Sequence, residues 1–328
     1  MTTTGNSESA PGLTELFHAQ RARLWGLAYR LTGTAEDAED IVQEAFVRLM
    51  ARPPGPGSEQ DLGRWLSRVA TNLGIDALRR RRRRRYVGPW LPTPIEGVEI
   101  GVLDSLPSDD PGPEARYSLA ESATYAFMLA LEVLSPRQRA VLLLRDVFGH
   151  SARETAERLA TSEGGVRVLH LRARRALEAY DASRCVPTAE VVARHQAVLA
   201  RFLRCLLAGD APGVEAVLAE NVETLTDAAG EYTALAAPLV GRERVARLYL
   251  MATLHRREGG VRVETRSING LPAALISVAR PVRRQAPRAL LRCDLDSDDR
   301  IRVVHAILAS RKLAALRPSR VASGSDTA

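Results

Sequence analysis

Apolar side chains recur at helical spacing over the first third of the chain. One apolar stripe covers residues 13–31 and stops at Gly33, and a second follows Thr34, a residue type that caps helices. The second stripe consists of Ala38, Ile41, Val42, Ala45, Phe46 and Leu49. A third amphipathic helix is expected to begin near Asp61 and to run into an arginine tract at 79–85. The pattern predicts a bundle of three helices.

A second helical region is expected from residue 116 to about residue 180. Two helices, at about 136–147 and 151–160, precede a tight turn and a longer helix. Ser151 and Glu154 form a capping box at the start of the second of these helices. The residues expected to be buried by the longer helix are Val166, Leu169, Ala173, Ala176 and Leu177. This is the layout of a helix-turn-helix.

The two helical regions are separated by a segment with a different composition. Residues 88–115 are rich in proline, glycine, serine and aspartate, which predicts a linker. Its piece Trp90-Leu91-Pro92-Thr93-Pro94 is too apolar for a simple spacer. An exposed Trp-Leu pair would be unfavourable, so another part of the chain is expected to cover it.

After residue 187 the pattern changes class. Helices are expected at about 189–208, 212–219 and 242–253, and strands at 261–268, 273–278, 289–295 and 300–308. Helices followed by antiparallel strands predict an α+β domain with a curved sheet closed over by helices. His305 alternates with apolar residues and is expected to point into this cone, with Asp294 or Asp227 nearby. Such a pair could move protons next to a carbonyl, or His305 could be an ordinary buried histidine.

The basic residues are densest in one part of the chain rather than spread evenly along it. The chain has 46 Lys+Arg against 39 Asp+Glu, for a net charge of +7, and Lys312 is its only lysine. Seven consecutive arginines at 79–85 indicate a polyanionic partner contacted by one region. The three cysteines lack metal-ligand spacing, and no apolar run approaches the ~18 residues of a membrane span. We therefore expect a cytoplasmic protein with reduced thiols, no metal, no cofactor and no membrane contact.

The basic side chains suggest a nucleic-acid interface with two parts. On the longer helix, Arg167, Leu171 and Arg174 face outward, where a recognition helix meets the major groove. The full set predicted there is Arg167, His170, Leu171, Arg172, Arg174 and Arg175. Arg64 and Arg68, with the arginine tract, can line phosphates and so supply affinity without reading sequence. The alternative is a helical hairpin with a solvated basic face.

Several runs resemble extracytoplasmic-function sigma factors of bacterial RNA polymerase. The runs are Asp37-Ala-Glu-Asp-Ile-Val-Gln-Glu-Ala-Phe46, Trp65-Leu-Ser-Arg-Val-Ala-Thr-Asn72 with Asp76-Ala-Leu-Arg79, and Leu134-Ser-Pro-Arg-Gln-Arg139 through Arg172-Ala-Arg174. The resemblance implies an all-α sigma region 2 at 13–87 and an all-α region 4 at 116–184, joined by the linker at 88–115. The ends, 1–12 and 314–328, are expected to be flexible.

The resemblance also implies partners and contacts. Region 2 would dock on the clamp helices of the polymerase β′ subunit through Asp37, Asp40, Gln43 and Glu44, and region 4 would meet the β flap. The promoter −10 element would be contacted by Arg64, Arg68, Asn72, Arg79, Arg80, Arg81 and Arg83. The loop 52–61 with Asn72 would hold a flipped base. The helix-turn-helix set would then read the −35 element.

The part at 188–313 resembles the SnoaL-like (NTF2-like, cystatin-cone) fold. A subfamily of these sigma factors carries such a domain, with a linker motif Trp-Leu-Pro-Glu-Pro, and uses it in place of an anti-sigma protein. The implied interdomain residues are Trp90, Leu91, Pro92, Pro94, Asp227 and Lys312. Two further family motifs are altered here, to Asp227-Ala-Ala-Gly-Glu231 and Ala309-Ser-Arg-Lys-Leu313, so a weaker regulatory effect is expected.

Three functional hypotheses remain at this point. The leading one is a noncatalytic sigma factor whose activity its C-terminal domain modulates, with or without a small-molecule ligand. The second is an isomerase- or cyclase-like enzyme fused to a DNA-binding region. The third is a repressor that works without polymerase. The acidic side of the helix at 34–50 argues against a repressor, which needs no polymerase-docking surface.

Overall fold

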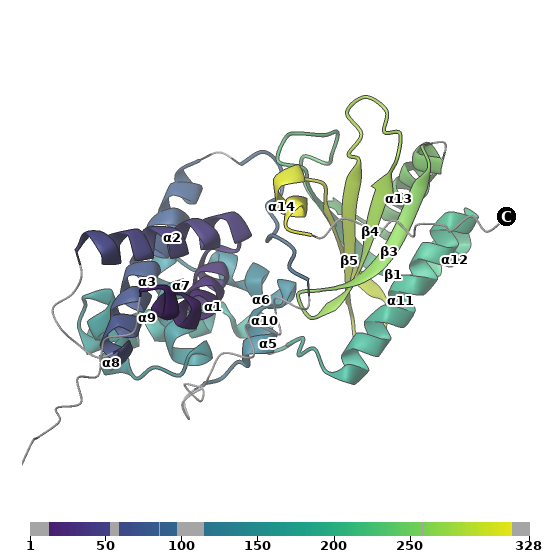
Figure 1. Ribbon diagram of the computed structural model, residues 1–328. Coiled ribbons are helices and arrows are strands. Elements are labelled where there is room, and N and C mark those ends of the chain that lie inside the picture. Colours follow the sequence, from purple (N-terminus) through teal and green to yellow (C-terminus); the bar gives the residue numbers. More distant parts are fainter. Residues whose placement is uncertain (1–12, 53–58, 85, 97–114, 258, 317–328) are drawn as a thin grey trace, which may run out of the picture. The chain divides into compact units, whose positions relative to one another are not determined.

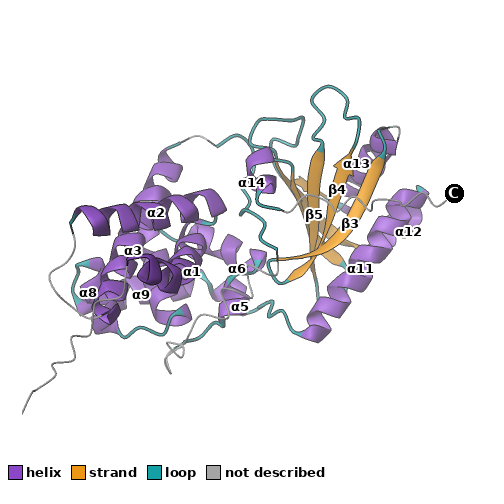
Figure 2. Ribbon diagram, in the orientation of Figure 1, coloured by secondary structure: helices purple, strands orange, loops and turns teal. Residues whose placement is uncertain are grey.

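The computed structural model describes residues 13–52, 59–84, 86–96, 115–257 and 259–316 (Figure 1). These residues form two compact units. The first consists of the described residues within 13–84, 115–122 and 130–183, and the second of those within 86–96, 123–129 and 184–316. The strands lie in the second unit, and the regular elements described in the first are helices (Figure 2).

The first unit contains the predicted three-helix bundle. Its helices are α1 (Leu13–Thr32), α2 (Ala35–Ala51) and α3 (Glu59–Arg83), and the six apolar residues predicted for α2 are all buried. Thr34 caps α2 by accepting a hydrogen bond from the Asp37 amide at 3.2 Å. Helix α3 begins two residues before Asp61, and positions 53–58 of the predicted loop lie outside the described residues.

The second group of helices in this unit follows the prediction with two differences. It comprises α5 (Leu119–Ser122), η1 (Leu131–Val133), α7 (Pro136–Leu142), η2 (Leu143–Val147), α8 (Ala152–Leu159), α9 (Glu163–Ala176) and α10 (Glu178–Asp181). The helix predicted to 147 continues past Leu142 as a π-helical turn, and the long helix ends at Ala176. Ala176 is exposed rather than buried, because a turn of about 100° per residue puts it at the edge of the stripe of Val166, Ala173 and Leu177.

The second unit is built on a six-stranded sheet of order β2-β1-β6-β5-β4-β3. The strands are β1 (Leu218–Asp227), β2 (Leu239–Val240), β3 (Val261–Ile268), β4 (Leu271–Val278), β5 (Arg288–Leu295) and β6 (Ile301–Ile307). Strands β3 to β6 pair antiparallel, as predicted, and the α+β class is confirmed. The prediction missed β2 and also β1, which runs parallel to β6.

The two faces of this sheet have different covers. Helices α11 (Ala189–Ala208), α12 (Ala211–Val217) and α13 (Arg242–Arg257) pack on one side, here called the helix face, around Phe202 and Tyr249. The other side, here called the linker face, packs against Leu91 of segment 86–96, Tyr125 of α6 (Tyr125–Ala130) and Leu313 of α14 (Ser310–Ala314). The predicted apolar linker piece is therefore part of this core.

None of the helices among the described residues combines the length and the apolar character that are needed to cross a lipid bilayer.

Candidate functional site

An acidic surface lies along the outer side of α2, in the first unit. Asp40 and Gln43 are exposed, and Glu44 pairs with Arg48 at 2.8 Å. Asp37 also takes part in the cap of α2, because its carboxylate accepts a hydrogen bond from the Thr34 hydroxyl at 2.6 Å. All four predicted residues line one shallow hollow.

Two further residues of α2 belong to this acidic surface. Arg48 lines the same hollow, as does Val47, whose residue is 50% exposed. The prediction passed over Val47. An apolar residue at an outward position of a polar helix side was the signal that could have identified it.

The outer side of α3 carries the predicted −10 residues. Arg64, Arg68 and Asn72 follow one another at intervals of four, share one side of the helix and are exposed. Arg79, Arg80 and Arg83 are also exposed, and Arg79 pairs with Asp76 at 2.9 Å. These six side chains remain accessible to an anionic partner.

Arg64 and Arg68 have acidic neighbours within the first unit. With Trp65 they line a hollow to which α8 contributes Glu154 and Glu157. Part of the basic side of α3 therefore lies close to acidic groups of the second helical region.

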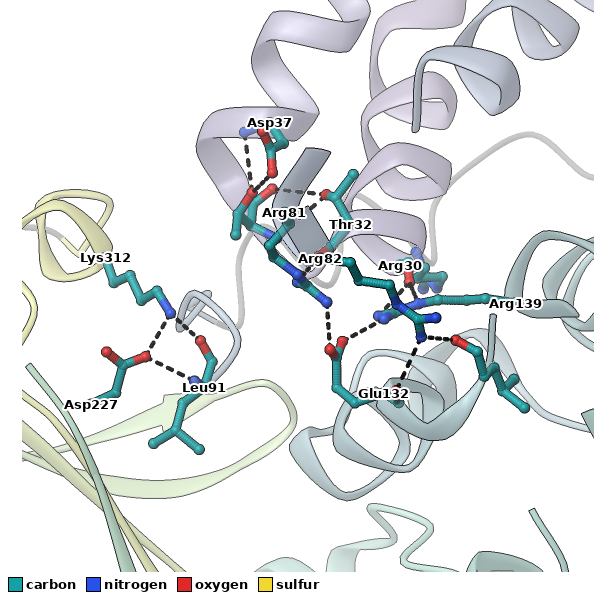
Figure 3. Close-up of polar contacts among 12 residues, drawn as sticks. Arg30, Thr32, Asp37, Arg81, Arg82, Leu91, Glu132, Arg139, Asp227 and Lys312 are labelled. Carbon is teal, nitrogen blue, oxygen red and sulfur yellow. Dashed lines mark hydrogen bonds and ion pairs between the residues drawn. The ribbon is translucent and has the colours of Figure 1, made fainter. Parts of the chain in front are cut away.

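Like Arg82, which donates hydrogen bonds to the carbonyls of Glu132 and Leu134, Arg81 is held by the protein itself. It donates a hydrogen bond to the carbonyl of Thr32 at 2.7 Å and forms an ion pair with Glu132 (Figure 3). Glu132 also pairs with Arg139 of α7, whose side chain is 1% exposed and reaches the carbonyl of Arg30 at 3.2 Å. This Arg81–Glu132–Arg139 cluster joins the three-helix bundle to the second helical region.

The charges of this cluster depend on one another. Burial alone would raise the pKa of Glu132, but the charges of Arg139 and Arg81 outweigh burial and hold the pKa below its ordinary value. Burial lowers the pKa of Arg139 to about 10, against the opposing charge of Glu132. Glu132 is therefore ionised between two cations at neutral pH.

Helix α9 presents the predicted −35 residues, with one exception. Arg167, Leu171, Arg172, Arg174 and Arg175 are exposed. The exception is His170, whose Nε2 lies 2.8 Å from Oδ1 of Asp146 and whose side chain is 16% exposed. His170 therefore faces the protein interior.

The start of α9 is formed by a capped turn. Ser162 accepts a hydrogen bond from the amide of Gly165 at 3.1 Å, and Ala160 closes α8 in the left-handed conformation with φ of 47°. Prediction overlooked Val168, which is 49% exposed on the same helix as the arginines. The arrangement of α8, turn and α9 is that of a helix-turn-helix.

In the second unit, a buried carboxylate fastens the linker segment. Asp227, at the end of β1, is fully buried and accepts hydrogen bonds from the Leu91 amide at 2.8 Å and the Tyr86 hydroxyl at 2.5 Å. Lys312 of α14 donates to Asp227 at 2.6 Å and also to the carbonyl of Leu91 (Figure 3). The Lys312 ammonium lies 4.7 Å from the ring centre of Trp90. We call Tyr86, Trp90, Leu91, Asp227 and Lys312 the linker latch.

The latch brings together four of the six residues predicted for regulation and adds Tyr86. The other two, Pro92 and Pro94, are buried, and the carbonyl of Pro92 accepts a hydrogen bond from Tyr125 at 2.6 Å. Tyr86 was missed because it precedes the linker motif. An aromatic residue next to an arginine tract gives no sign of its partner.

A second fastening lies at the other end of the same segment. The Asn269 side chain accepts a hydrogen bond from the Ile95 amide at 2.9 Å and donates one to the carbonyl of Ala123 at 2.7 Å. Asn269 has φ of 51°, a conformation that asparagine tolerates better than most residues. Arg266 adds an ion pair with Glu96. The segment is held at both ends.

The structure corrects the prediction for His305. His305 faces the linker face, 6.1 Å from the ring of Tyr125, whereas Ala306 lines the cavity on the helix face. The prediction placed His305 on the cavity side by counting alternate residues from Ile301. That count fails because the pairing of β5 with β6 shifts register between Asp294 and Leu295, next to Ile301. Burial lowers the pKa of His305 to about 4, against the opposing charge of Asp294 at 3.8 Å. A neutral histidine outside the cavity has no access to a substrate there.

Comparisons with known proteins match both helical regions. Residues 16–84 match the family model described as Sigma-70 region 2, and residues 125–177 match that described as Sigma-70, region 4. The chain is 37% identical over 237 residues to the ECF RNA polymerase sigma factor SigJ of Mycobacterium tuberculosis, with 71% of each chain covered. It is 35% identical over 266 residues to SigG of the same organism, with 77% of this chain and 70% of that one covered.

The similarity extends beyond the helical regions. The crystal structure of the Mycobacterium tuberculosis extracytoplasmic function sigma factor SigJ matches with a TM-score of 0.67 at 27% identity. The matched region covers 92% of this chain and 98% of the SigJ chain in that crystal structure. A match of this extent includes the α+β domain.

Replacing Glu132 by glutamine tests the Arg81–Glu132–Arg139 cluster. The variant leaves a buried arginine without its counterion, so we expect a loss of about 2–3 kcal/mol in the free energy of unfolding. This is below the value for a fully buried pair because the Glu132 side chain is 31% exposed. Urea unfolding of the full chain measures the loss. Glu157→Gln, which breaks the exposed pair with Arg153, should cost less than about 1 kcal/mol.

The same variant gives a prediction about pH. Because the folded-state pKa of Glu132 is lowered, its contribution is present above the unfolded-state pKa and is lost as pH falls through the folded-state pKa. The stability difference between the wild type and Glu132→Gln should therefore shrink as the pH falls below about 4.5. A difference that stays constant down to pH 3 would contradict an ionised Glu132.

Proposed function

Since the chain belongs to the extracytoplasmic-function RNA polymerase sigma factors, we propose that it binds core RNA polymerase and directs it to specific promoters. The observation that carries the proposal is that two different exposed surfaces accompany the two matched regions, an acidic one on α2 and a basic one on α9. Core-dependent transcription from selected promoter DNA tests it directly. A protein of this function works where the polymerase works, in the cytoplasm.

We assign polymerase docking to the acidic surface of α2. Asp40 and Gln43 are exposed and Glu44 is partly exposed around Val47, so the surface combines negative charge with an accessible apolar centre. Charge at the rim of an interface sets orientation and association rate, while a central apolar side chain loses water on contact. The clamp helices of the polymerase β′ subunit are the proposed partner, and region 4 is proposed to meet the β flap.

DNA contact is assigned to α9 and to exposed arginines of α3. The exposed side chains Arg167, Leu171 and Arg174 lie along α9, where a recognition helix faces the major groove. Arg79, Arg80 and Arg83, with Arg64, Arg68 and Asn72, are proposed for the −10 element because they are exposed. Arg81 and His170 leave this proposal, because each is bound to another part of the protein.

Regulation is assigned to the linker latch. The latched segment continues into the three-helix bundle at residue 84, and residues 123–129, fastened to the same sheet, continue into the second helical region at residue 130. The two DNA-reading regions are thus joined through stretches of chain that the α+β domain holds. Movement of one region away from the other is limited while the latch is closed.

The enzyme hypothesis required His305 to line a cavity, and it lies on the opposite face of the sheet. The repressor hypothesis does not explain the acidic surface of α2, because a repressor needs no polymerase-docking surface. Neither hypothesis gains an observation from the structure.

The docking assignment is tested by reversing charge at two positions, Asp40→Arg with Glu44→Arg. The double variant should lose co-purification with core polymerase, because an attractive surface becomes repulsive. Its thermal midpoint should stay near that of the wild type, since surface changes usually alter stability by no more than about 0.5 kcal/mol. Glu220→Arg with Glu243→Arg makes the same change of net charge on exposed residues of the second unit and should retain core binding. Retained binding by the α2 variant would place docking elsewhere.

Sequence reading and phosphate contact are separated by two single variants. Arg167→Ala should weaken holoenzyme binding to the preferred −35 sequence by roughly 1–3 kcal/mol more than to a scrambled one, as expected for a bidentate contact with guanine. Arg83→Ala should weaken both equally and reduce the salt dependence, because it removes one phosphate contact. Fluorescence anisotropy at several salt concentrations measures both effects. Equal losses for Arg167→Ala on the two DNAs would make Arg167 a phosphate contact.

Opening the latch tests regulation. Lys312→Met leaves the buried Asp227 carboxylate without its counterion, and Trp90→Ala removes the ring beside the ammonium. Both should change transcription from a cognate promoter in the same direction, and both should speed chymotrypsin cleavage at Tyr86. Arg283→Met, on an exposed turn, is the matched control and should change neither.

Transcription equal to wild type in both latch variants, despite faster cleavage, would show that the latch does not regulate. Point variants are preferable to removal of the chain after residue 184, because that removal would also uncover residues 123–129.

A further inference from the structure

The helix face of the sheet encloses a cavity of about 310 Å³. Its walls are mainly apolar, with Leu203, Leu206 and Leu207 from α11, Leu248 from α13, and Val263 and Ile276 from the sheet. A volume of this size falls within the roughly 300–1,000 Å³ of small-molecule sites. The cavity can hold the apolar body of a ligand.

Two hydroxyl groups of the cavity lining, those of Tyr249 and Thr253, are already hydrogen-bonded within the protein. The Tyr249 hydroxyl is hydrogen-bonded to Thr224 at 2.7 Å, and burial raises the pKa of Tyr249. Thr253 donates to the carbonyl of Tyr249 at 2.8 Å. These groups hold α13 to itself and to β1.

Arg256 differs from them. It is half-buried on α13 and lines the cavity, and its buried Nε has no hydrogen-bond partner. Its Nη1 reaches only the carbonyl of Ala252, at 3.4 Å. No aspartate or glutamate is among the described residues that line the cavity. Burial lowers the pKa of Arg256, against a smaller opposing effect of Tyr249.

We propose that this cavity binds an amphipathic monocarboxylate, with its apolar chain among the leucines of α11 and its carboxylate on Arg256. A carboxylate would supply the missing acceptor for Nε in a charge-assisted hydrogen bond. A neutral apolar ligand would leave the guanidinium unpaired. A phosphate monoester would bring close to two negative charges to one cation.

Isothermal titration of the full-length protein with decanoate and with decanol tests the proposal. Decanoate should bind saturably, with one site per chain, and about tenfold to a hundredfold more tightly than decanol, the factor expected for a charge-assisted hydrogen bond. Arg256→Met keeps an unbranched apolar stem at this position and removes the charged guanidinium. That variant should lose the preference for decanoate while its affinity for decanol stays near the wild-type value.

Two further variants complete the test. Arg247→Met removes an exposed arginine of the same helix that is not part of the cavity lining, so the preference for decanoate should persist. Ala252→Phe fills the cavity from α13 and should weaken the binding of both ligands.

Three results would overturn the proposal: no saturable binding of decanoate, equal affinities of the wild type for decanoate and decanol, or an unchanged preference in Arg256→Met. The comparison of ligands on the wild type needs no variant, so it decides even if Arg256→Met does not fold. The titration uses neither polymerase nor DNA. Its outcome is therefore independent of the sigma-factor proposal.

Discussion

The buried carboxylate of Asp227 is the constraint on which the organisation of the second unit depends. A carboxylate removed from water is costly unless charge and hydrogen bonds compensate it. Asp227 obtains that compensation from the chain's only lysine, Lys312, and from Leu91 and Tyr86, which lie 85 to 141 residues away in sequence. The end of β1, helix α14 and the linker segment must therefore meet at one point. Because that segment also covers apolar residues of the sheet, latch and core stabilise each other.

The first unit also contains a buried charge that is compensated by a partner, but here the buried group is a cation. Arg139 is almost fully buried, and Glu132 compensates it while also binding Arg81 at the end of α3. The contact engages an arginine that the sequence pattern assigned to DNA. While Arg81 is paired with Glu132, its charge is compensated within the protein. In both units a single buried charge joins segments that are distant in sequence.

Elements set by local pattern could be predicted from sequence, and those set by distant partners could not. The strand Val261–Ile268 and the helix Ala189–Ala208 have the expected bounds, because alternation and a Thr188 cap mark them. Strand β1 was missed, since its parallel pairing with β6 joins residues about 80 positions apart and its polar residues blur the period. Exposed site residues on α2, α3 and α9 lay where periodicity put them. The inward turn of His170 and the capture of Arg81 each depend on a partner, Asp146 or Glu132, that no local pattern identifies.

The altered motifs around Asp227 and Lys312 preserve the latch because the changed positions carry contacts of their own. Glu231 ends the altered motif that begins at Asp227, and its carboxylate accepts a hydrogen bond from the Ser310 amide at 3.2 Å. Next to it, the Tyr232 hydroxyl lies 2.7 Å from that of Ser310. These bonds hold the start of α14, the helix that carries Lys312. A short helix has little stability of its own, so its position depends on such contacts. The exposed positions of the motifs can therefore change, provided that some pair of them fixes α14 and the buried Asp227 and Lys312 are kept.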